Sequence, residues 1–270
     1  MAGKELQTQQ ERGLSIEDYL LAPTFRAQLE LAAPRGVQAI RMARAVLTLA
    51  RGDSKLAECS SGSLRSAVMC CVQTGLEPGP LGHAAIVPFA RKATWQAMYK
   101  GLLHLAYRSD KIAAVQAGVV YANDEFDHDM GSAPFVHFKK ALVPEAERGE
   151  RVAAFAAIVP KEGPAIVRVE HISEIERIRD RYSKGQREDR PWLSEFDEMA
   201  CKTVIKRAAK WAPVSVELGI AIGWDDLADT GKEQKAYTED PSTDDFCNKA
   251  IGDDGMVCSL PADHPAECAP

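Results

Sequence analysis

The sequence predicts an α+β fold in which an antiparallel β-sheet of about 4–5 short strands is flanked by helices. Apolar residues recur every three or four positions at both ends of the first 224 residues, which is typical of amphipathic helices. Between these ends, residues 84–170 hold short runs rich in Val, Ile, Ala and aromatic residues, which are typical of strands. Because these strands do not alternate regularly with helices, a parallel sheet is not expected.

Two helices are predicted in the first third of the chain. Val37, Ile40 and Ala43 begin an apolar stripe, and their spacing predicts a helix over residues 37–50. A second helix is predicted to end at Gly75, because glycine commonly ends helices. The Gly- and Pro-rich run GLEPGPLGH that follows is expected to form a loop.

Five runs in the middle of the chain are expected to form strands. Ala84–Phe89 and Thr94–Tyr99 are separated by a short ARKA connection and should pair as an antiparallel hairpin. Alternation would place Trp95, Ala97 and Tyr99 on one face of the second strand, and a short helix should follow it. The other three predicted strands are residues 112–121, 151–159 and 165–170.

Two further helices are expected to close the ordered part of the chain. Ser173 followed by Glu176, and Ser194 followed by Asp197, match the capping box with which helices begin. Pro213 is expected to end the second of these helices, because the residue before a proline disfavours helical geometry.

The last predicted helix is basic on one side. At about 100° per residue its cations fall within one arc, and its apolar residues take the opposite side. The cations are Lys202, Lys206, Lys210 and Arg207. Since no acidic residue follows Glu198 on this helix to pair with them, the helix is predicted to present four cations that would repel one another unless an anion binds.

Acidic residues concentrate near the C-terminus. The chain has 33 Lys and Arg against 39 Asp and Glu, which gives a net charge of −6. Residues 225–270 hold twelve of the acids and three of the bases, so residues 1–224 carry 30 bases and 27 acids. Because such a composition cannot bury enough apolar surface to fold, residues 225–270 are predicted to be a disordered acidic tail. Residues 36–224 should form the core, and residues 1–35 a helical or flexible N-terminal segment.

Composition and spacing argue against several classes of protein. The chain lacks the run of about 18–20 apolar residues that spans a membrane, and its first thirty residues lack an apolar signal core. Seven cysteines without a secretory signal favour reduced thiols, so a cytoplasmic location is predicted.

No cofactor, metal site or catalytic residue is predicted. The phosphate-binding motif G-x-x-x-x-G-K-[ST] does not occur, so ATP is not expected, and Mg²⁺ is expected only to modulate activity. The acids of residues 124–131 resemble a calcium loop, but the glycine comes one residue late. Alternation should instead place Glu125, Asp127 and Asp129 on the wet face of a strand. The six histidines show no paired metal-binding spacing.

The basic helix suggests a surface for a polyanion. The predicted hairpin turn adds Arg91 and Lys92, and the end of its second strand adds Gln96, Tyr99 and Lys100. Cations that meet phosphates, together with a ring on which bases stack, are the combination that binds single strands. A solvated helix face is the plain structural alternative. Two other functional classes stay open: a metal-dependent enzyme that processes DNA ends, and a non-catalytic protein whose basic face meets an acidic partner.

Four separated blocks of the sequence resemble the RecT family of phage-type single-strand DNA annealing proteins. They are LAECSSGSLRSAVMCCVQTGLEPGPLGHAAIVPF, WQAMYKGLLHLAYRSDKI, VVYANDEF and PWLSEFDEMACKTVIKRAAKW, and the likeness spans roughly residues 47–219. The resemblance implies a protein that is not an enzyme, binds single-stranded DNA without ATP and anneals complementary strands in recombination. It also implies a ring or helical filament of many copies, with a companion exonuclease or a host single-strand binding protein as partners.

The resemblance further implies which residues contact DNA. They would line a basic groove in a core, residues 36–224, that also carries the contacts between copies. The residues implied are Arg91, Lys92, Gln96, Tyr99, Lys100, Lys202, Lys206, Arg207 and Lys210.

Overall fold

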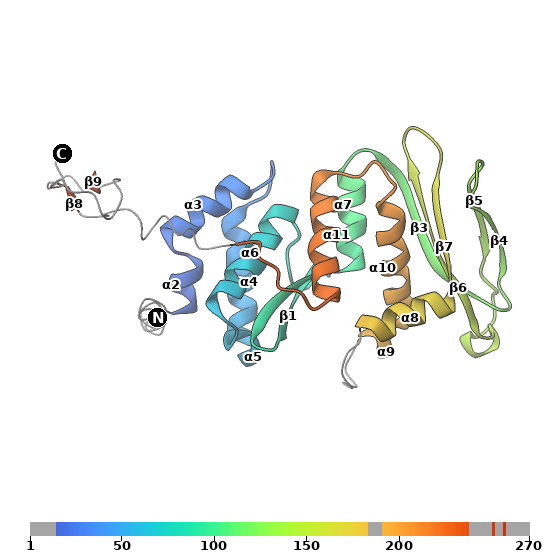
Figure 1. Cartoon of the computed structure of the whole chain (residues 1–270), viewed down its shortest axis with the longest axis horizontal. Helices are drawn as coiled ribbons and strands as arrows, with labels where there is room; N and C mark the ends of the chain where they lie inside the picture. The colour runs from blue at the N-terminus through green and yellow to red at the C-terminus, as the bar shows by residue number, and fades with distance from the viewer. Residues whose placement is uncertain (1–14, 183–190, 238–249, 252–255, 258–270) are drawn as a thin grey trace. The chain divides into compact units, whose positions relative to one another are not determined.

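The computed structural model describes residues 15–182, 191–237, 250–251 and 256–257. The chain divides into two units, Met1–Ala236 and Tyr237–Pro270 (Figure 1). In the second unit, the short strands β8 (Ala250–Ile251) and β9 (Met256–Val257) pair antiparallel. Most of the predicted acidic tail lies outside the described residues. None of the helices described is long and apolar enough to cross a membrane.

Within the described residues, the first unit begins with five helices. They are α2 (Ile16–Leu20), α3 (Pro23–Ala32), α4 (Ala39–Gly52), α5 (Ser54–Ala57) and α6 (Ser61–Thr74). Helix α4 confirms the helix predicted over residues 37–50. Leu20, Phe25 and Leu29 are fully buried, and α2 and α3 contact α4 and α6. The packed part of the chain therefore begins before residue 36, where the sequence suggested a boundary.

Helix α6 ends at Gly75, as predicted. Gly75 has a φ of +68°, the left-handed conformation that glycine adopts without strain. A Cβ at this position would lie 2.7 Å from Nη1 of Arg108 and 2.8 Å from Cγ2 of Val37. Glycine is therefore required both for the backbone turn and for the close packing of α6.

The predicted hairpin is present. Strands β1 (Ala84–Phe89) and β2 (Lys92–Ala97) pair antiparallel, and only Ala90 and Arg91 connect them. Both connecting residues have positive φ, of 47° and 61°. Two consecutive residues of this kind match the tight turn that suits the twist of paired strands.

One detail of this region was predicted wrongly. Trp95 and Ala97 share a buried face of β2, as expected, but Tyr99 does not continue the strand. Tyr99 is instead the first residue of α7 (Tyr99–Arg108), and its side chain leaves the alternating pattern because the backbone turns helical there.

The outer edge of β2 is covered by side chains rather than by another strand. The amide N–H of Ala93 donates to Oγ of Ser63 at 2.9 Å, and that of Trp95 to Oε1 of Gln234 at 2.8 Å. The N–H of Ala97 donates to Oδ1 of Asp225 at 3.0 Å. Because these edge groups already have partners, the hairpin is complete with two strands.

A separate three-stranded sheet lies farther along the chain. Its strands are β3 (Ile112–Tyr121), β6 (Arg151–Pro160) and β7 (Ile166–His171), in the antiparallel order β3-β6-β7. A second hairpin, β4 (Glu125–Asp129) and β5 (Phe135–Lys139), packs Phe126 and Phe138 against Phe155 of β6. Figure 1 shows this hairpin on one side of the sheet and helix α10 on the other.

The prediction of one sheet with four or five strands is therefore wrong in its connectivity. The class is α+β with antiparallel strands, as expected, but the first hairpin forms a sheet of its own because side chains cover its edge. The acids of β4 do lie on a wet face, as predicted, since Glu125, Asp127 and Asp129 are all exposed.

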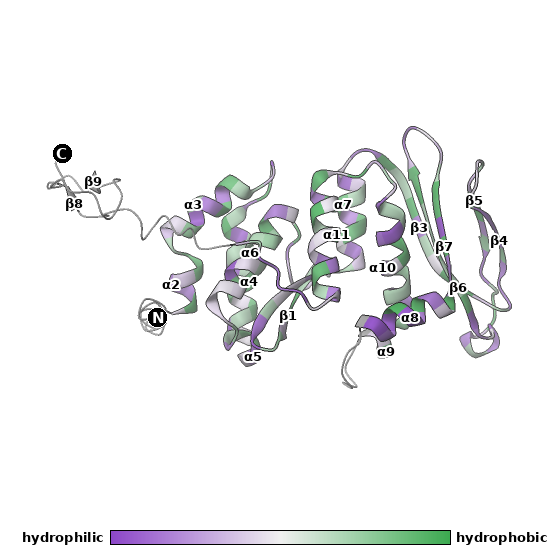
Figure 2. Ribbon diagram, viewed as in Figure 1, coloured by the Kyte–Doolittle hydropathy of each residue, from purple (hydrophilic) through white to green (hydrophobic). Residues whose placement is uncertain are grey.

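Helices close the first unit. They are α8 (Ile172–Tyr182), α9 (Pro191–Ser194), α10 (Phe196–Ala209) and α11 (Val216–Asp229). Figure 2 shows that hydrophilic residues dominate α8. Neither predicted capping box is formed: Ser173 lies inside α8, and α10 begins after Glu195 without a side-chain cap.

Helix α11 was not expected. Ser215 caps it by accepting a hydrogen bond from the N–H of Leu218 at 3.2 Å. The helix runs through Trp224 to Asp229, so the boundary drawn at residue 225 falls inside an ordered helix. Asp225 is fully buried, which places it in the core rather than in a tail.

The rings of His83 and His104 are stacked, with centroids 4.6 Å apart. The pKa of His104 is lowered by burial, by His83 and by Arg108, all of which disfavour a protonated ring. Because folding lowers the pKa of His104 below its unfolded value of 6.5, the unfolded chain binds the proton more readily than the folded protein does. We therefore expect stability to fall as the pH drops below that value. Urea midpoints at several pH values should show a smaller fall for His104→Gln, and parallel curves for the two proteins would contradict this role.

Candidate nucleic-acid interface

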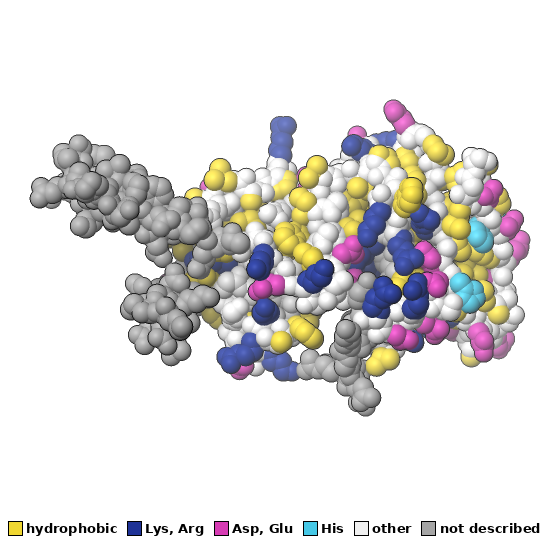
Figure 3. Space-filling view, in the orientation of Figure 1, with side chains coloured by type: hydrophobic (Ala, Val, Ile, Leu, Met, Phe, Trp, Pro, Cys, Tyr) yellow, Lys and Arg dark blue, Asp and Glu magenta, His cyan; other side chains and the backbone are white. Residues whose placement is uncertain are grey.

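A groove of about 300 Å³ lies among helices α8, α9, α10 and α11. Six of the side chains that line it are basic, and Figure 3 shows Lys and Arg gathered on this face with acidic side chains beside them. The six are Arg177, Arg181, Lys202, Lys206, Arg207 and Lys210. The structure therefore brings together all four cations that the sequence placed on one helix face, and it adds two arginines from α8.

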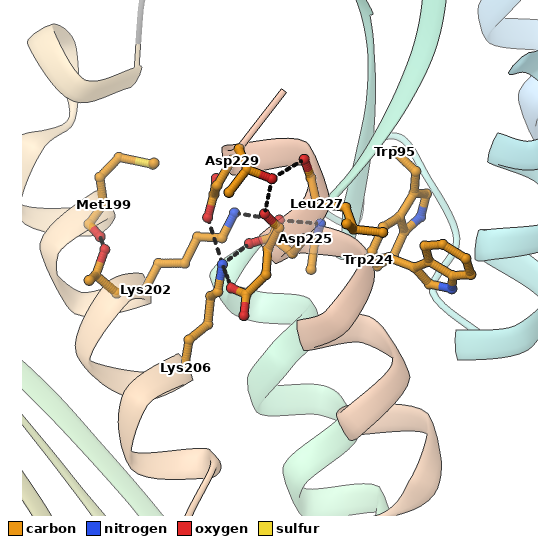
Figure 4. Close-up of polar contacts among 12 residues, drawn as sticks. Trp95, Met199, Lys202, Lys206, Trp224, Asp225, Leu227 and Asp229 are labelled. Atoms are coloured by element: carbon orange, nitrogen blue, oxygen red, sulfur yellow. Dashed lines mark hydrogen bonds and ion pairs between the residues drawn. The ribbon is translucent and has the colours of Figure 1, made fainter. Parts of the chain in front are cut away.

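The floor of the groove is a buried ion-pair cluster. Nζ of Lys202 lies 2.8 Å from Oδ1 of Asp225, and Nζ of Lys206 lies 2.7 Å from Oδ2 of the same residue (Figure 4). Lys206 also contacts Asp229 at 2.6 Å and Asp226 at 2.7 Å. Lys202 is 7% exposed, Lys206 is 6% exposed and Asp225 is 0% exposed. These residues hold α10 and α11 together.

The charges of the cluster support one another. Burial alone would lower the pKa of Lys206, but Asp225 and Asp229 outweigh burial and raise it. Burial would likewise raise the pKa of Asp226, but hydrogen bonds from Lys206 and Lys210 hold it below its usual value. Lys206 and Asp226 therefore favour their charged forms, whereas the pKa of Asp229 is raised by burial and by Asp225.

The prediction that α10 presents four cations to solvent is wrong for Lys202 and Lys206. The anions that relieve their repulsion belong to the protein, because α11 places Asp225, Asp226 and Asp229 against them. Whether these two lysines contact DNA stays a prediction, but their burial gives them a structural role first.

The rim of the groove carries the accessible charges. The side chain of Lys210 is 54% exposed and pairs with Asp226 at 2.8 Å. Arg207 pairs with Glu170 of β7 at 2.6 Å, and Arg177 pairs with Glu174 on its own helix. Exposed pairs of this kind are weak and can exchange one anion for another, so a phosphate could replace these carboxylates.

The remaining predicted contacts lie elsewhere in the first unit. Arg91 and Lys92 are exposed at the β1–β2 turn, and Lys92 pairs with Glu233 at 3.1 Å. Gln96 lies on β2, and Lys100 is exposed on α7. Neither these four residues nor Tyr99 is among the described residues that line the basic groove. These five residues therefore do not line the same groove as the cations of α10, and their contact with DNA stays a prediction.

Tyr99 lines a second pocket, of about 650 Å³. Its walls come from α7, β3, β5, β6 and α10, and they include Gln116, Phe138 and Glu198. Cys201 also faces this pocket, and burial together with Glu198 raises its pKa to about 12, so its thiol is neutral. The predicted aromatic partner of the cations therefore lies in a different cavity from them.

Sequence reasoning missed two arginines and a tryptophan of the basic groove. Arg177 and Arg181 are four residues apart on α8 and so share a face, a spacing that was visible in the sequence. Trp192 follows a charged segment and belongs to no sequence motif or helical stripe that predicts its position. Only the structure places it in the groove.

No group of three or more His, Cys, Asp or Glu residues within the described part of the chain is arranged to hold a metal ion.

Comparisons with known proteins agree on one family. A model of the RecT family matches residues 41–244. Protein RecT of Escherichia coli (strain K12) is 33% identical over 236 residues, which cover 84% of this chain and 83% of that protein. The uncharacterized protein YqaK of Bacillus subtilis (strain 168) is 24% identical over 264 residues, which cover 90% and 89% of the two chains.

Proposed function

The chain belongs to the RecT family, and on this premise we propose that it binds single-stranded DNA and anneals complementary strands during recombination, without ATP. The observation that carries the proposal is the groove among α8, α10 and α11, where six cations and a tryptophan line one concave surface. Phosphates need cations, and bases need flat apolar rings, so this lining suits a single strand.

The arrangement of charges suits annealing rather than sequence recognition. A strand held mainly by its phosphates is bound with little regard to sequence, and its base edges stay available for pairing. Sequence specificity would then come from the second strand. Because such binding releases counterions, affinity should fall steeply with salt.

The rim cations are the ones we assign to phosphate contacts. Arg177, Arg181 and Lys210 lie on the groove and are exposed. Arg177 and Lys210 can exchange their carboxylate partners, Glu174 and Asp226, for phosphates without unfolding the floor. Lys206 would be a poor test of binding, because its removal also leaves Asp225 and Asp229 short of a counterion.

A triple variant, Arg177→Ala with Arg181→Ala and Lys210→Ala, should therefore bind a (dT) oligonucleotide much more weakly. We expect a loss on the order of a hundredfold at low salt, since each charge-assisted contact contributes about 1.5–3 kcal/mol before compensation. The slope of log affinity against log salt should fall in magnitude by about two, since each single-strand contact contributes roughly 0.7. Fluorescence anisotropy over a salt series measures both quantities.

Two controls sharpen this experiment. Arg26, Arg35 and Arg44 are exposed on or near α3 and α4, and their triple alanine variant removes the same charge without touching the groove. Asp226→Asn removes the acid that competes for Lys210, so it should bind more tightly than the wild type. Equal losses in both triple variants would contradict the assignment of the groove.

Annealing itself is tested by adding two complementary labelled oligonucleotides in succession. Full-length duplex formed without ATP supports the proposal. Shortened products in the presence of Mg²⁺ would instead favour an enzyme that processes DNA ends.

From family membership we also propose assembly into rings or filaments on DNA, and a companion exonuclease or a host single-strand binding protein as partner. Mass photometry with and without DNA tests the assembly.

A further inference from the structure

Trp192 is the aromatic residue of the basic groove among the residues the structure describes. It belongs to α9, and its side chain is partly exposed. The cations that line the same groove come from α8 on one side and α10 on the other. This placement puts an indole ring within the same concave surface as the groups that would hold phosphates.

The ring packs against Phe196, which in turn has a cationic neighbour. Trp192 packs against Phe196 in an edge-to-face arrangement, with centroids 5.8 Å apart. The guanidinium of Arg151 lies 4.9 Å from the Phe196 ring, and Nε of Arg151 donates to Asp197 at 2.6 Å. This edge-to-face contact orients the indole, and the Trp192 side chain stays partly exposed.

The sequence predicted Tyr99 as the stacking surface, but Tyr99 lines the other pocket. We propose that Trp192 stacks on a nucleobase of the bound single strand. This inference rests on the proposed function and adds the residue that holds the base.

The physical argument concerns what annealing requires of a base contact. A ring that stacks on the face of a base contributes affinity for any of the four bases, because each has a π-face. It also leaves the pairing edge of the base exposed. A hydrogen-bonding side chain would instead occupy that edge. Trp192 therefore suits a protein that must hold a strand and still let it pair.

Trp211 offers a matched comparison. Its side chain is 70% exposed at the end of α10, and the guanidinium of Arg168 lies 4.9 Å from its ring. Trp211 is not among the described residues that line the groove. Trp211 is thus a more exposed tryptophan outside the groove, whereas Trp192 lines the groove together with the cations.

The test uses two oligonucleotides of equal length, one of thymidines and one of abasic sites, which share phosphates but differ in bases. Trp192→Leu should bind the thymidine strand between about fivefold and 150-fold more weakly, the factor that corresponds to one stacked base. It should bind the abasic strand as the wild type does. Trp192→Phe should restore most of the loss, and Trp211→Leu should bind both strands normally.

The other outcomes decide against the proposal. Equal weakening of Trp192→Leu on both strands would show a structural role, and unchanged binding on both would show no role. If Trp192→Leu fails to fold, Trp192→Phe and Trp192→Tyr take its place. The proposal expects at least one of them to keep the wild-type ratio between the affinities for the thymidine strand and the abasic strand. If both lose the preference for the thymidine strand, stacking at this position is overturned. If the wild-type protein binds neither strand, the proposed function itself fails, which separates the two failures.

Discussion

Replacing Asp225 by alanine should lower the free energy of unfolding by about 3–5 kcal/mol, the range observed when one partner of a buried ion pair is removed. Asp225 is fully buried and accepts hydrogen bonds from Lys202, Lys206 and the backbone N–H of Ala97. The alanine variant removes the ion-pair partner of Lys202 and leaves the buried edge amide of Ala97 on β2 without its acceptor. Three elements, α10, α11 and β2, lose one common anchor.

Urea denaturation followed by circular dichroism measures this effect. Asp225→Asn keeps an acceptor for the amide of Ala97 but removes the charge, so its loss should be smaller than that of the alanine variant. Asp180 is the matched control, because it is exposed on α8 and pairs with Arg179 at 2.8 Å. Asp180→Ala should leave the midpoint nearly unchanged, since exposed pairs contribute little. Similar midpoints for Asp225→Ala and Asp180→Ala would refute the role of the cluster.

A chain that ends at Trp224 should not fold cooperatively, whereas a chain that ends at Ala236 should. The shorter chain lacks Asp225, the last turn of α11 and Gln234. Gln234 matters because its side chain accepts from the N–H of Trp95 at 2.8 Å and donates to the carbonyl oxygen of Trp95 at 2.7 Å. The loss of these partners leaves buried charges and edge groups unpaired at once.

Thermal melts of the two truncated proteins test this expectation directly. A single sharp transition at the full-length midpoint for the chain ending at Ala236, and none for the chain ending at Trp224, is the expected pair of results. Two equal transitions would show that residues 225–236 are dispensable for the fold.

The chain that ends at Ala236 also has a less negative net charge than the full chain. It loses eight acids and one base. We expect it to bind single-stranded DNA more tightly than the full chain at low salt, because a net negative segment repels phosphates over long range. The difference should shrink as salt is added, since screening shortens that range. An unchanged or weaker affinity would indicate that residues 237–270 serve another purpose.

The elements of the fold were largely predictable because each leaves a local pattern. The first strand, Ala84–Phe89, and the strand from Ile112 to Tyr121 match their predicted bounds, and Gly75 ends its helix as expected. The pairing of strands was less predictable. Whether β2 accepts another strand depends on Gln234 and Asp225, which are more than a hundred residues away in the chain.

The site was harder to predict for the same reason. Helical spacing correctly placed Lys202, Lys206 and Lys210 on one side of α10, but spacing does not reveal what faces that side. Asp225 and Asp226 were attributed to a tail because acids dominate their neighbourhood, although Leu218, Ala221 and Ile222 before them follow a helical period. The net charge of residues 225–270, taken as a whole, concealed the end of α11, whose acidic residues form ion pairs with the lysines of α10.

The covered edge of β2 bears on how copies of the chain could join. Strands that lie side by side are a common route to both ordered polymers and aggregates. At β2 that route is closed, because Ser63, Gln234 and Asp225 occupy the three amide groups that a new strand would need. Copies of this chain that join one another would therefore do so through surfaces other than the outer edge of β2.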